Sequence, residues 1–161
     1  MTNQSDDLIR NIGDTVKGLG GEVQSSTKDA ITVQLPTEHL IEAARAFTER
    51  HGLSHLSTMT GLDSGDNVEV LYHFWKGDVI ASLRISVPKS STHAPSIVEV
   101  VPGAILYEME VHDMFGVVFD GNPWMDRKLL LPDNYPSDLP PPLLKGTKSS
   151  EIRKAVMGVD R

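Results

Sequence analysis

The sequence predicts one α+β domain in which helices pack against a mainly antiparallel sheet, with elements in the order α-β-β-α-β-β-β-α. Apolar residues recur at the spacing of one helical face over residues 5–19 and 37–51. They alternate with polar residues over 30–35, 68–74 and 79–87, as in strands with one buried face. A length of 161 residues suits a single domain with one core.

The first half of the chain begins with a helix and a pair of strands. The helix is expected to end at Gly20 and to bury a stripe made of Leu8, Ile9, Ile12, Val16 and Leu19. Short strands are expected at 22–26 and 30–35, joined by a polar turn. Pro36 ends the second strand, and the helix that follows carries a stripe made of Leu40, Ile41, Ala44 and Phe47.

The middle of the chain predicts three strands and a short helix. Serine and threonine dilute the apolar pattern of the first strand, at 53–60. The next two strands, 68–74 and 79–87, form an antiparallel hairpin around a tight turn. Ser96 opens a Ser-Ile-Val-Glu pattern that has the form of a capping box, so a short helix is expected there, ended by Pro102.

Composition and charge limit the possible functions. The chain carries 15 Lys and Arg against 22 Asp and Glu, a formal charge of −7, which argues against nucleic acid as the main partner. It has no cysteine, so it cannot hold an iron–sulfur cluster or a zinc ion through thiolates. The polar N-terminus is unlike a signal peptide, and the apolar runs are too short for direct membrane insertion.

The composition changes near residue 135, which divides the chain into a predicted domain at 1–135 and a Pro-rich, basic tail at 136–161. Four of the ten prolines lie within residues 133–142, and a Pro-Pro-Pro run favours an extended, solvated path. The last 17 residues offer little apolar material for a core. The tail is therefore expected to be extended, and either disordered or laid along partner subunits.

Few residues fit the pattern of a metal or nucleotide site. His51 and His55 are four positions apart, but Gly52 lies between them and no carboxylate completes a zinc-protease motif. The glycines at 18–21 follow a helix and precede a strand, which reverses the order found in nucleotide-binding loops. These residues are better explained as helix ends and turns.

Charged and apolar residues are mixed most densely over residues 104–133. A helix with several carboxylates is expected to end at Gly116, and an extended apolar piece leads from there into a turn. Two interpretations stay open. In one, the helix covers the sheet and its acids pair with Arg127 and Lys128. In the other, an interface anchor rimmed by charge is formed by exposed Trp124, Met125 and the leucines that follow.

This stretch resembles the signature of the 30 kDa subunit of respiratory complex I, the NADH–quinone oxidoreductase. The resemblance extends over roughly residues 5–135, because the predicted element order is similar to the fold of that family. The positions that carry the signature are Glu108, Glu110, Asp113, Phe115, Gly116, Phe119, Gly121, Pro123, Arg127, Leu129, Leu130, Pro132 and Asp133.

Several positions depart from the family pattern. Met109 stands where the family usually has Arg, and Asn122 stands where it has His. One extra residue is needed near Trp124, and the tail lacks the usual ending. These departures are more similar to archaeal relatives, namely the coenzyme F420H2 dehydrogenase and energy-converting hydrogenases, with the F420H2 branch favoured.

The resemblance implies a cofactor-free assembly subunit in the peripheral arm of a membrane-bound, ion-translocating oxidoreductase, on the cytoplasmic side of the cell membrane. Its partners would be a large 49 kDa-like or NiFe-like subunit, which forms the quinone site in complex I, and iron–sulfur subunits. Iron–sulfur clusters, with flavin or NiFe, would sit in those partners. The donor would be F420H2, NADH or ferredoxin, and the acceptor a quinone, a phenazine or protons. The signature residues, with Trp124, would then form a subunit interface.

An alternative hypothesis is that residues of the same stretch form a catalytic or metal-binding site. Glu108 and His112 are four positions apart on the expected helix, and Asp113 is adjacent. A small stand-alone hydrolase or metal-dependent enzyme could be built on them, although a pair of ligands is too few for a tight metal site. Metal content and turnover of the isolated chain distinguish the two hypotheses.

Overall fold

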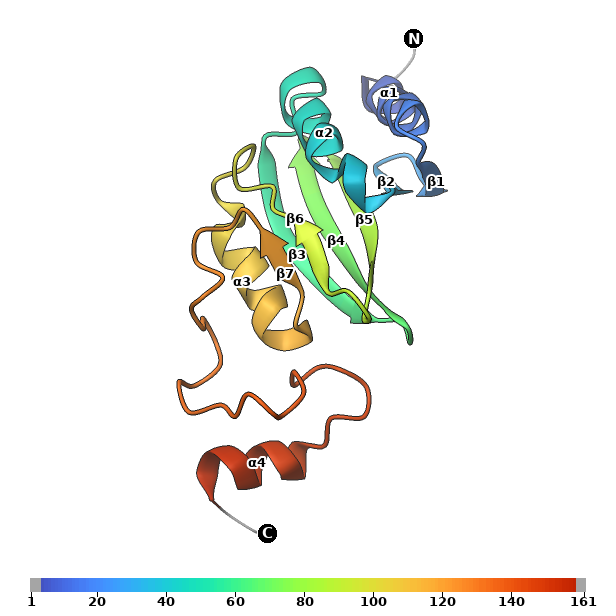
Figure 1. The fold of residues 1–161 in the computed structure, drawn as a ribbon. Helices are drawn as coiled ribbons and strands as arrows, with labels where there is room; N and C mark the ends of the chain where they lie inside the picture. Colours follow the sequence, from blue (N-terminus) through green and yellow to red (C-terminus); the bar gives the residue numbers. More distant parts are fainter. Residues whose placement is uncertain (1–3, 159–161) are drawn as a thin grey trace.

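The first three helices of the described chain lie against one face of a five-stranded sheet, and the last helix lies apart from it (Figure 1). The computed structural model describes residues 4–158. The helices are α1 (Gln4–Gly18), α2 (Leu40–Arg45), α3 (Ala104–Phe115) and α4 (Ser149–Met157). The strands are β1 (Glu22–Ser26), β2 (Ala30–Gln34), β3 (His55–Asp63), β4 (Asn67–Lys76), β5 (Val79–Pro88), β6 (His93–Pro95) and β7 (Val118–Asp120). The predicted α+β class is confirmed.

The sheet has the strand order β1-β2-β5-β4-β3, and every neighbouring pair is antiparallel except β2 and β5. The predicted hairpin is confirmed, because β4 pairs with β5 along its whole length and Tyr72 lies opposite Leu83. The opposite face of the sheet carries exposed side chains, among them Trp75 and Ile80. A separate parallel pair joins β6 to β7 and so brings the loop before α3 beside the strand after it.

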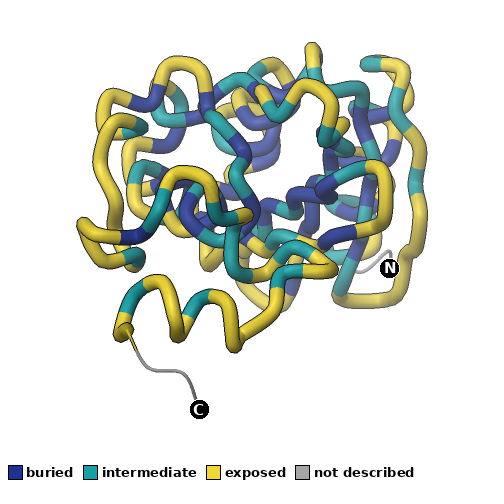
Figure 2. The backbone as a smooth tube through the Cα atoms, turned by 60° about the horizontal axis from the view of Figure 1, so that its bottom comes forward, coloured by how far each residue is buried: buried dark blue, intermediate teal, exposed yellow. Residues whose placement is uncertain are grey.

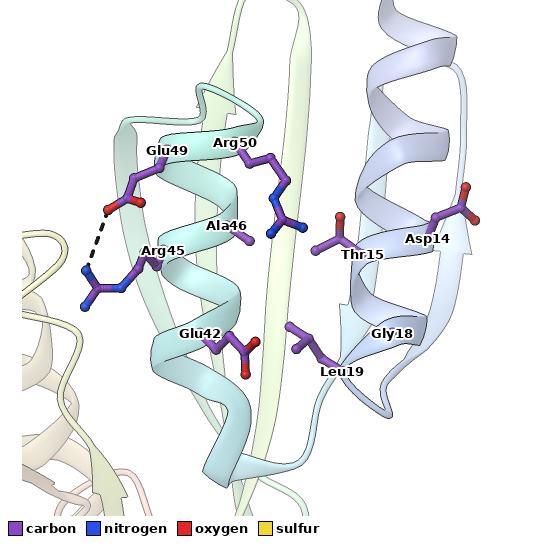
Figure 3. Close-up of a pocket in the computed structure, with 9 residues that line it drawn as sticks. All are labelled: Asp14, Thr15, Gly18, Leu19, Glu42, Arg45, Ala46, Glu49 and Arg50. Atoms are coloured by element: carbon purple, nitrogen blue, oxygen red, sulfur yellow. Dashed lines mark ion pairs between the residues drawn. The ribbon is translucent and has the colours of Figure 1, made fainter.

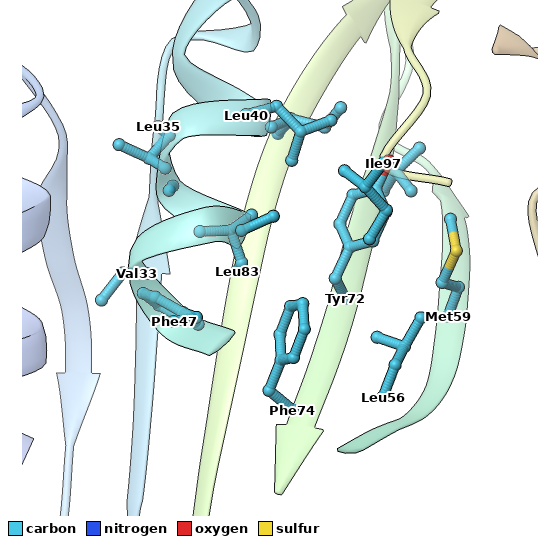
Figure 4. Close-up of a cluster of buried hydrophobic side chains, with 14 of the residues drawn as sticks. Val33, Leu35, Leu40, Phe47, Leu56, Met59, Tyr72, Phe74, Leu83 and Ile97 are labelled. Atoms are coloured by element: carbon cyan, nitrogen blue, oxygen red, sulfur yellow. The ribbon is translucent and has the colours of Figure 1, made fainter. Parts of the chain in front are cut away.

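The core lies between the sheet and the helices that cover it. Phe47, just after α2, stands edge-on against Phe74, with ring centroids 5.5 Å apart (Figure 4). Ile12 and Val16 from α1 are fully buried against the same layer, which confirms the predicted stripe. Each fully buried side chain of this kind contributes about 2 kcal/mol through the hydrophobic effect. Packing of apolar side chains is therefore what holds this half of the molecule.

The second predicted helix is less regular than its apolar stripe suggests. It begins with a 3₁₀ turn at Thr37–His39, continues as α2 and ends in a π-helical turn at Ala46–Arg50. Leu40, Ala44 and Phe47 are nevertheless all fully buried. The apolar spacing predicted the buried face, but not the widening of the last turn.

The short helix expected from Ser96 is absent, and this prediction is wrong. Residues 98–100 form a turn, and the next helix begins only at Ala104. The Ser96 hydroxyl donates a hydrogen bond to Glu108, and Glu99 reaches Arg45 at 3.1 Å. The two side chains of the capping-box pattern thus have tertiary partners, which outweigh the local pairing that the pattern favours.

The tail runs along its own domain before it turns away. The Leu143 N–H donates to the Met114 carbonyl at 3.0 Å, and the Lys145 N–H donates to Asp63 at 2.7 Å. Residues 149–157, which were expected to be extended, instead form α4, with Gly158 as its left-handed C-cap. Figure 2 shows that this helix is mostly exposed. The domain boundary at residue 135 stays a prediction.

The apolar runs of the sequence were predicted to be too short for direct membrane insertion. Within residues 4–158, none of the helices combines the length and the apolar character that crossing a bilayer requires.

Candidate functional site

Glu108, on α3, joins three segments of the chain from inside the protein. Its side chain is fully buried. Its carboxylate accepts hydrogen bonds from the Ser96 hydroxyl at 2.7 Å, the Ile97 N–H at 2.9 Å and the Asn122 amide at 2.9 Å. Asn122 in turn donates to the carbonyl of Ile105 and accepts from the backbone N–H of the second residue after it. The loop before α3 and the turn after β7 are therefore held to the same carboxyl group.

Burial and hydrogen bonding act on Glu108 in opposite directions. Desolvation raises the pKa of this carboxyl above its usual range, while the donors from Ile97, Ser96 and Asn122 lower it, and desolvation wins. The nearby Tyr72 hydroxyl is fully buried and has no hydrogen-bond partner in the described part of the chain. Burial, and then the charge of Glu108, raise the pKa of Tyr72 well above its usual value.

Asp113 fixes the segment that follows β7. One of its oxygens accepts three consecutive backbone N–H groups, from Leu129 at 2.8 Å, Leu130 at 2.6 Å and Leu131 at 3.1 Å. We call residues 121–133 the strap. Because the strap is held through its backbone, its side chains stay free to face outward, and Leu130 is 56% exposed.

The strap also presents an aromatic anchor next to a positive charge. Trp124 is 38% exposed, and the Arg127 guanidinium lies over its ring, 5.6 Å from the centroid. Lys128 donates to the backbone carbonyls of residues 132, 133 and 135. Among the described residues, the ion pair of the Arg127 guanidinium is with Asp126, at 3.9 Å. The prediction that α3 covers the sheet is confirmed, because it packs against β3. The prediction that its acids pair with Arg127 and Lys128 is wrong.

Asp63, at the end of β3, holds the tail in the same way. Its carboxylate accepts from the Lys89 ammonium at 2.6 Å, the Lys145 N–H at 2.7 Å and the Gly65 N–H at 2.9 Å. The Lys89 hydrogen bond, helped by the two backbone donors, holds the pKa of Asp63 well below its usual range. Asp63 was not predicted from the sequence, since Lys89 and Lys145 lie far from it along the chain.

Comparison with known proteins identifies the family. The family model described as "Respiratory-chain NADH dehydrogenase, 30 Kd subunit" matches residues 33–152. The chain belongs to this family. A curated relative, an NADH-quinone oxidoreductase subunit of Saccharopolyspora erythraea, is 33% identical over 113 residues, which cover 65% of this chain and 45% of the relative. The chain spans about half the length of the first curated relatives that it matches.

Two solved structures are similar to the fold. A trypsin-resistant fragment of Nqo5 aligns with a TM-score of 0.61 at 25% identity, over 72% of this chain and 98% of the fragment. A chain from the membrane-bound sulfane sulfur reductase, an archaeal respiratory membrane complex, aligns with a TM-score of 0.77 over 99% of this chain and 95% of that chain. The second match has 22% identity and shows the fold alone.

The family signature divides into inward-facing and outward-facing residues. Glu108, Asp113, Phe115 and Phe119 are buried within the chain, so they can act on a partner only by positioning the strap. Gly116 ends α3 with a left-handed φ of 77°, as predicted. The exposed members lie on α3 or along the strap: Glu110, Gly121, Pro123, Trp124, Arg127, Leu129, Leu130, Pro132 and Asp133.

The residues of the alternative enzyme hypothesis are engaged elsewhere. His112 Nδ1 lies 2.9 Å from the Val117 carbonyl, and the oxygens of Glu108 and Asp113 accept hydrogen bonds from other segments. Over residues 4–158 there is no group of three or more His, Asp or Glu side chains placed to hold a metal ion. No observation at these residues favours a hydrolase over an interface.

Proposed function

We propose that this chain is an assembly subunit in the peripheral arm of a membrane-bound oxidoreductase related to complex I. The observation that carries the proposal is the strap, whose backbone is tied to Asp113 while its tryptophan and leucines face outward. A partner subunit would cover these side chains. The chain would bind no cofactor itself, and the electron carriers would lie in its partners.

The chemistry of the strap supports a protein partner. Tryptophan and arginine are the residue types most enriched at the centres of protein interfaces, and here Arg127 stacks on Trp124. A surface already fixed by hydrogen bonds loses little conformational entropy when it binds. The strap is thus a preorganised surface rather than a flexible loop.

The partners and the chemistry of the whole complex form the finer part of the proposal. The large subunit with the quinone or NiFe site would cover the strap, and iron–sulfur subunits would lie nearby. Absence of cysteine from this chain agrees with clusters held elsewhere. The complex would stand on the cytoplasmic side of the membrane and move ions across it.

The departures from the family pattern support an archaeal branch. Met109 is buried. The Asn122 amide donates a hydrogen bond to the Glu108 carboxylate, and a histidine at this position would make this contact with different geometry. We propose F420H2 as the donor, before NADH or ferredoxin, and a quinone or phenazine as the acceptor, before protons. Reduction assays of the purified complex with each donor test this choice directly.

The assembly proposal is tested by purification of the tagged chain from its own cells. It should co-purify with redox subunits, and Arg127→Ala or Glu110→Ala should lower the amount of assembled complex without changing the electron donor. Lys17→Ala, on the exposed side of α1, is the control. Normal assembly combined with lost electron transfer in the strap variants would refute the proposal.

A further inference from the structure

A groove between α1 and α2 is not explained by the strap or by the family signature. It has a volume of about 610 Å³ and is lined by the second half of α1, by α2 and by the π-helical turn after α2. It lies at the end of the molecule away from α4 and the tail (Figure 1). Its α1 wall also lies outside the residues that the family model matches. None of the residues that line the groove belongs to the family signature, so the signature assigns it no function.

The walls of the groove are fixed relative to each other. The Thr15 hydroxyl lies 2.9 Å from His51 Nε2, which links α1 to the end of the turn after α2. The His51 ring also stands edge-on against Phe47 in the core. Both helices pack on the same sheet, so the groove exists before any ligand binds.

The side chains that face the groove form a simple pattern, which Figure 3 shows. Leu19, Ala46 and Thr15 give a narrow floor without formal charge. Arg50 reaches into the groove near one end, and Glu42 points into it near the other. Asp14, Arg45 and Glu49 also line the groove, but their charged groups point away from the space between the helices. The groove interior therefore offers a cation and an anion separated by uncharged surface.

These two charges are poorly satisfied within the chain. The neighbouring Arg45, which points away from the groove, contacts Glu49 at 3.7 Å and Glu99 at 3.1 Å. Arg50 has no hydrogen bond or ion pair with any residue in the described range. Within the same range, the ionic contact of Glu42 is with His39, at 3.7 Å, and its side chain is 67% exposed. An external ligand could pair with both groups.

The spacing of the charges selects the kind of ligand. Arg50 and Glu42 are separated by eight positions, about two helical turns or roughly 12 Å. A helix that carries an acid and a base about two turns apart would match both, and it could lie lengthwise between α1 and α2 at ordinary helix-packing distances. An anionic lipid would satisfy Arg50 but would be repelled by Glu42.

We infer that the α1–α2 groove is the docking site for an α-helix of a second protein partner, which presents a carboxylate to Arg50 and a cation to Glu42. This inference goes beyond the proposed function, because it adds a partner at the end of the molecule opposite the strap. The chain would then hold a partner helix at this end in addition to the subunits proposed at the strap.

The direct test is site-specific photo-crosslinking in the complex. Benzoylphenylalanine replaces Asp14, an exposed residue at the rim of the groove, in the full-length tagged chain. Cells are irradiated, and the crosslinked peptide is identified by mass spectrometry. We expect a peptide from one other protein, within a helix that carries an acid and a base about two turns apart. A crosslink to a second copy of this chain, to a non-helical segment or to no protein would overturn the inference.

Variants of the groove provide a second readout. Arg50→Glu and Ala46→Trp should each reduce recovery of the crosslinked partner by about tenfold, the effect of losing roughly 1.4 kcal/mol of binding energy. Arg10→Glu and Lys17→Trp make matched changes on the exposed surface of α1 and should leave recovery unchanged. Reversing the charge of the partner's acid should restore binding to Arg50→Glu.

The strap variants separate this inference from the proposed function. Loss of assembly in Arg127→Ala, with full recovery of every subunit in both groove variants, would overturn the groove inference alone. Unchanged assembly in the strap variants would instead count against the proposed function. Folding of Ala46→Trp is checked by circular dichroism. If Ala46→Trp misfolds, Arg50→Glu still tests the inference, because position 50 is exposed.

Discussion

Two regions of this molecule are held together by different physics. The sheet with α1 and α2 is stabilised by a continuous apolar core that includes Phe47 and Phe74. Ile97 and Val101, in the loop before α3, also reach this core. The paths of that loop, the strap and the tail are fixed in addition by Glu108, Asp113 and Asp63, each of which accepts at least one backbone N–H. The first region consists mainly of helices and strands, whereas most of the second region lies outside regular secondary structure.

The difference explains how irregular segments can present a defined surface. Hydrophobic burial is non-directional and would draw the strap leucines inward. A carboxylate that accepts backbone N–H groups is directional, and it fixes the path of the chain while the side chains remain outside. The three carboxylates therefore give the strap its shape without using the apolar groups that a partner would cover.

The largest effect is expected for Glu108→Ala. Removal of the carboxylate leaves the Ile97 N–H and the Asn122 amide buried without their acceptor, which should lower the free energy of unfolding by about 3 kcal/mol. Urea denaturation measures the loss. Glu110→Ala, at an exposed position on the same helix, should change stability by less than about 0.5 kcal/mol. Equal losses of stability at the two positions would mean that the buried hydrogen bonds of Glu108 do not contribute to the free energy of unfolding.

A smaller and local effect is expected for Asp113→Ala. Three strap amides lose their acceptor, so their hydrogen exchange should accelerate by about 30-fold, equivalent to roughly 2 kcal/mol. Phe47→Ala, in contrast, should accelerate exchange throughout the sheet, because it opens a cavity in the shared core. Slow exchange of the strap amides in Asp113→Ala would remove the distinction between the two regions.

The sequence predicted the apolar region far better than the polar one. Periodicity located the α1 stripe and the hairpin, since one-faced burial leaves a repeating signal in neighbouring residues. The same local logic failed at Ser96, whose hydroxyl bonds to Glu108 twelve positions away instead of starting a helix. A pattern of neighbouring residues cannot show that a buried carboxylate elsewhere in the fold accepts the hydrogen bond of the Ser96 hydroxyl.

The carboxylate network left almost no signal in the sequence. Asp63 and Lys145 are 82 positions apart, and their bond depends on how the tail lies on the finished fold. The acids of α3 were expected to meet nearby basic side chains, but Asp113 meets backbone N–H groups, which every residue type except proline supplies.

Lowering the pH should weaken the attachment of the tail to Asp63. The folded-state pKa of Asp63 lies below its usual value of 3.8, because Lys89 and two backbone N–H groups stabilise the anion. This stabilisation is present above the usual pKa and is lost as the pH falls through the folded pKa. The advantage of the wild type over Asp63→Asn in thermal unfolding should therefore shrink with acidification.

The control for this titration is Asp78→Asn, at an exposed turn position. The difference in melting temperature between the wild type and this variant should stay nearly constant over the same pH range. A pH-independent difference for Asp63→Asn would show that the tail is not held by the ionised carboxylate.

The smallest effect, with the opposite sign, is expected for Tyr72→Phe. The Tyr72 hydroxyl is buried without a partner among the described residues, so its removal should raise stability by zero to about 1 kcal/mol. Tyr135→Phe is the matched control, because that hydroxyl donates to the Pro140 carbonyl at 2.7 Å and its loss should cost about 1 kcal/mol.

The Tyr72→Phe comparison also depends on pH, and the sign follows from the raised folded-state pKa of this phenol. Above about pH 10 the unfolded chain releases the Tyr72 proton, while the folded chain retains it. The wild type should therefore lose stability relative to Tyr72→Phe as the pH rises through this range. If the wild type instead stays more stable than the variant at every pH, the hydroxyl has a partner in solution, and Glu108, whose charge acts on Tyr72, is the group to test.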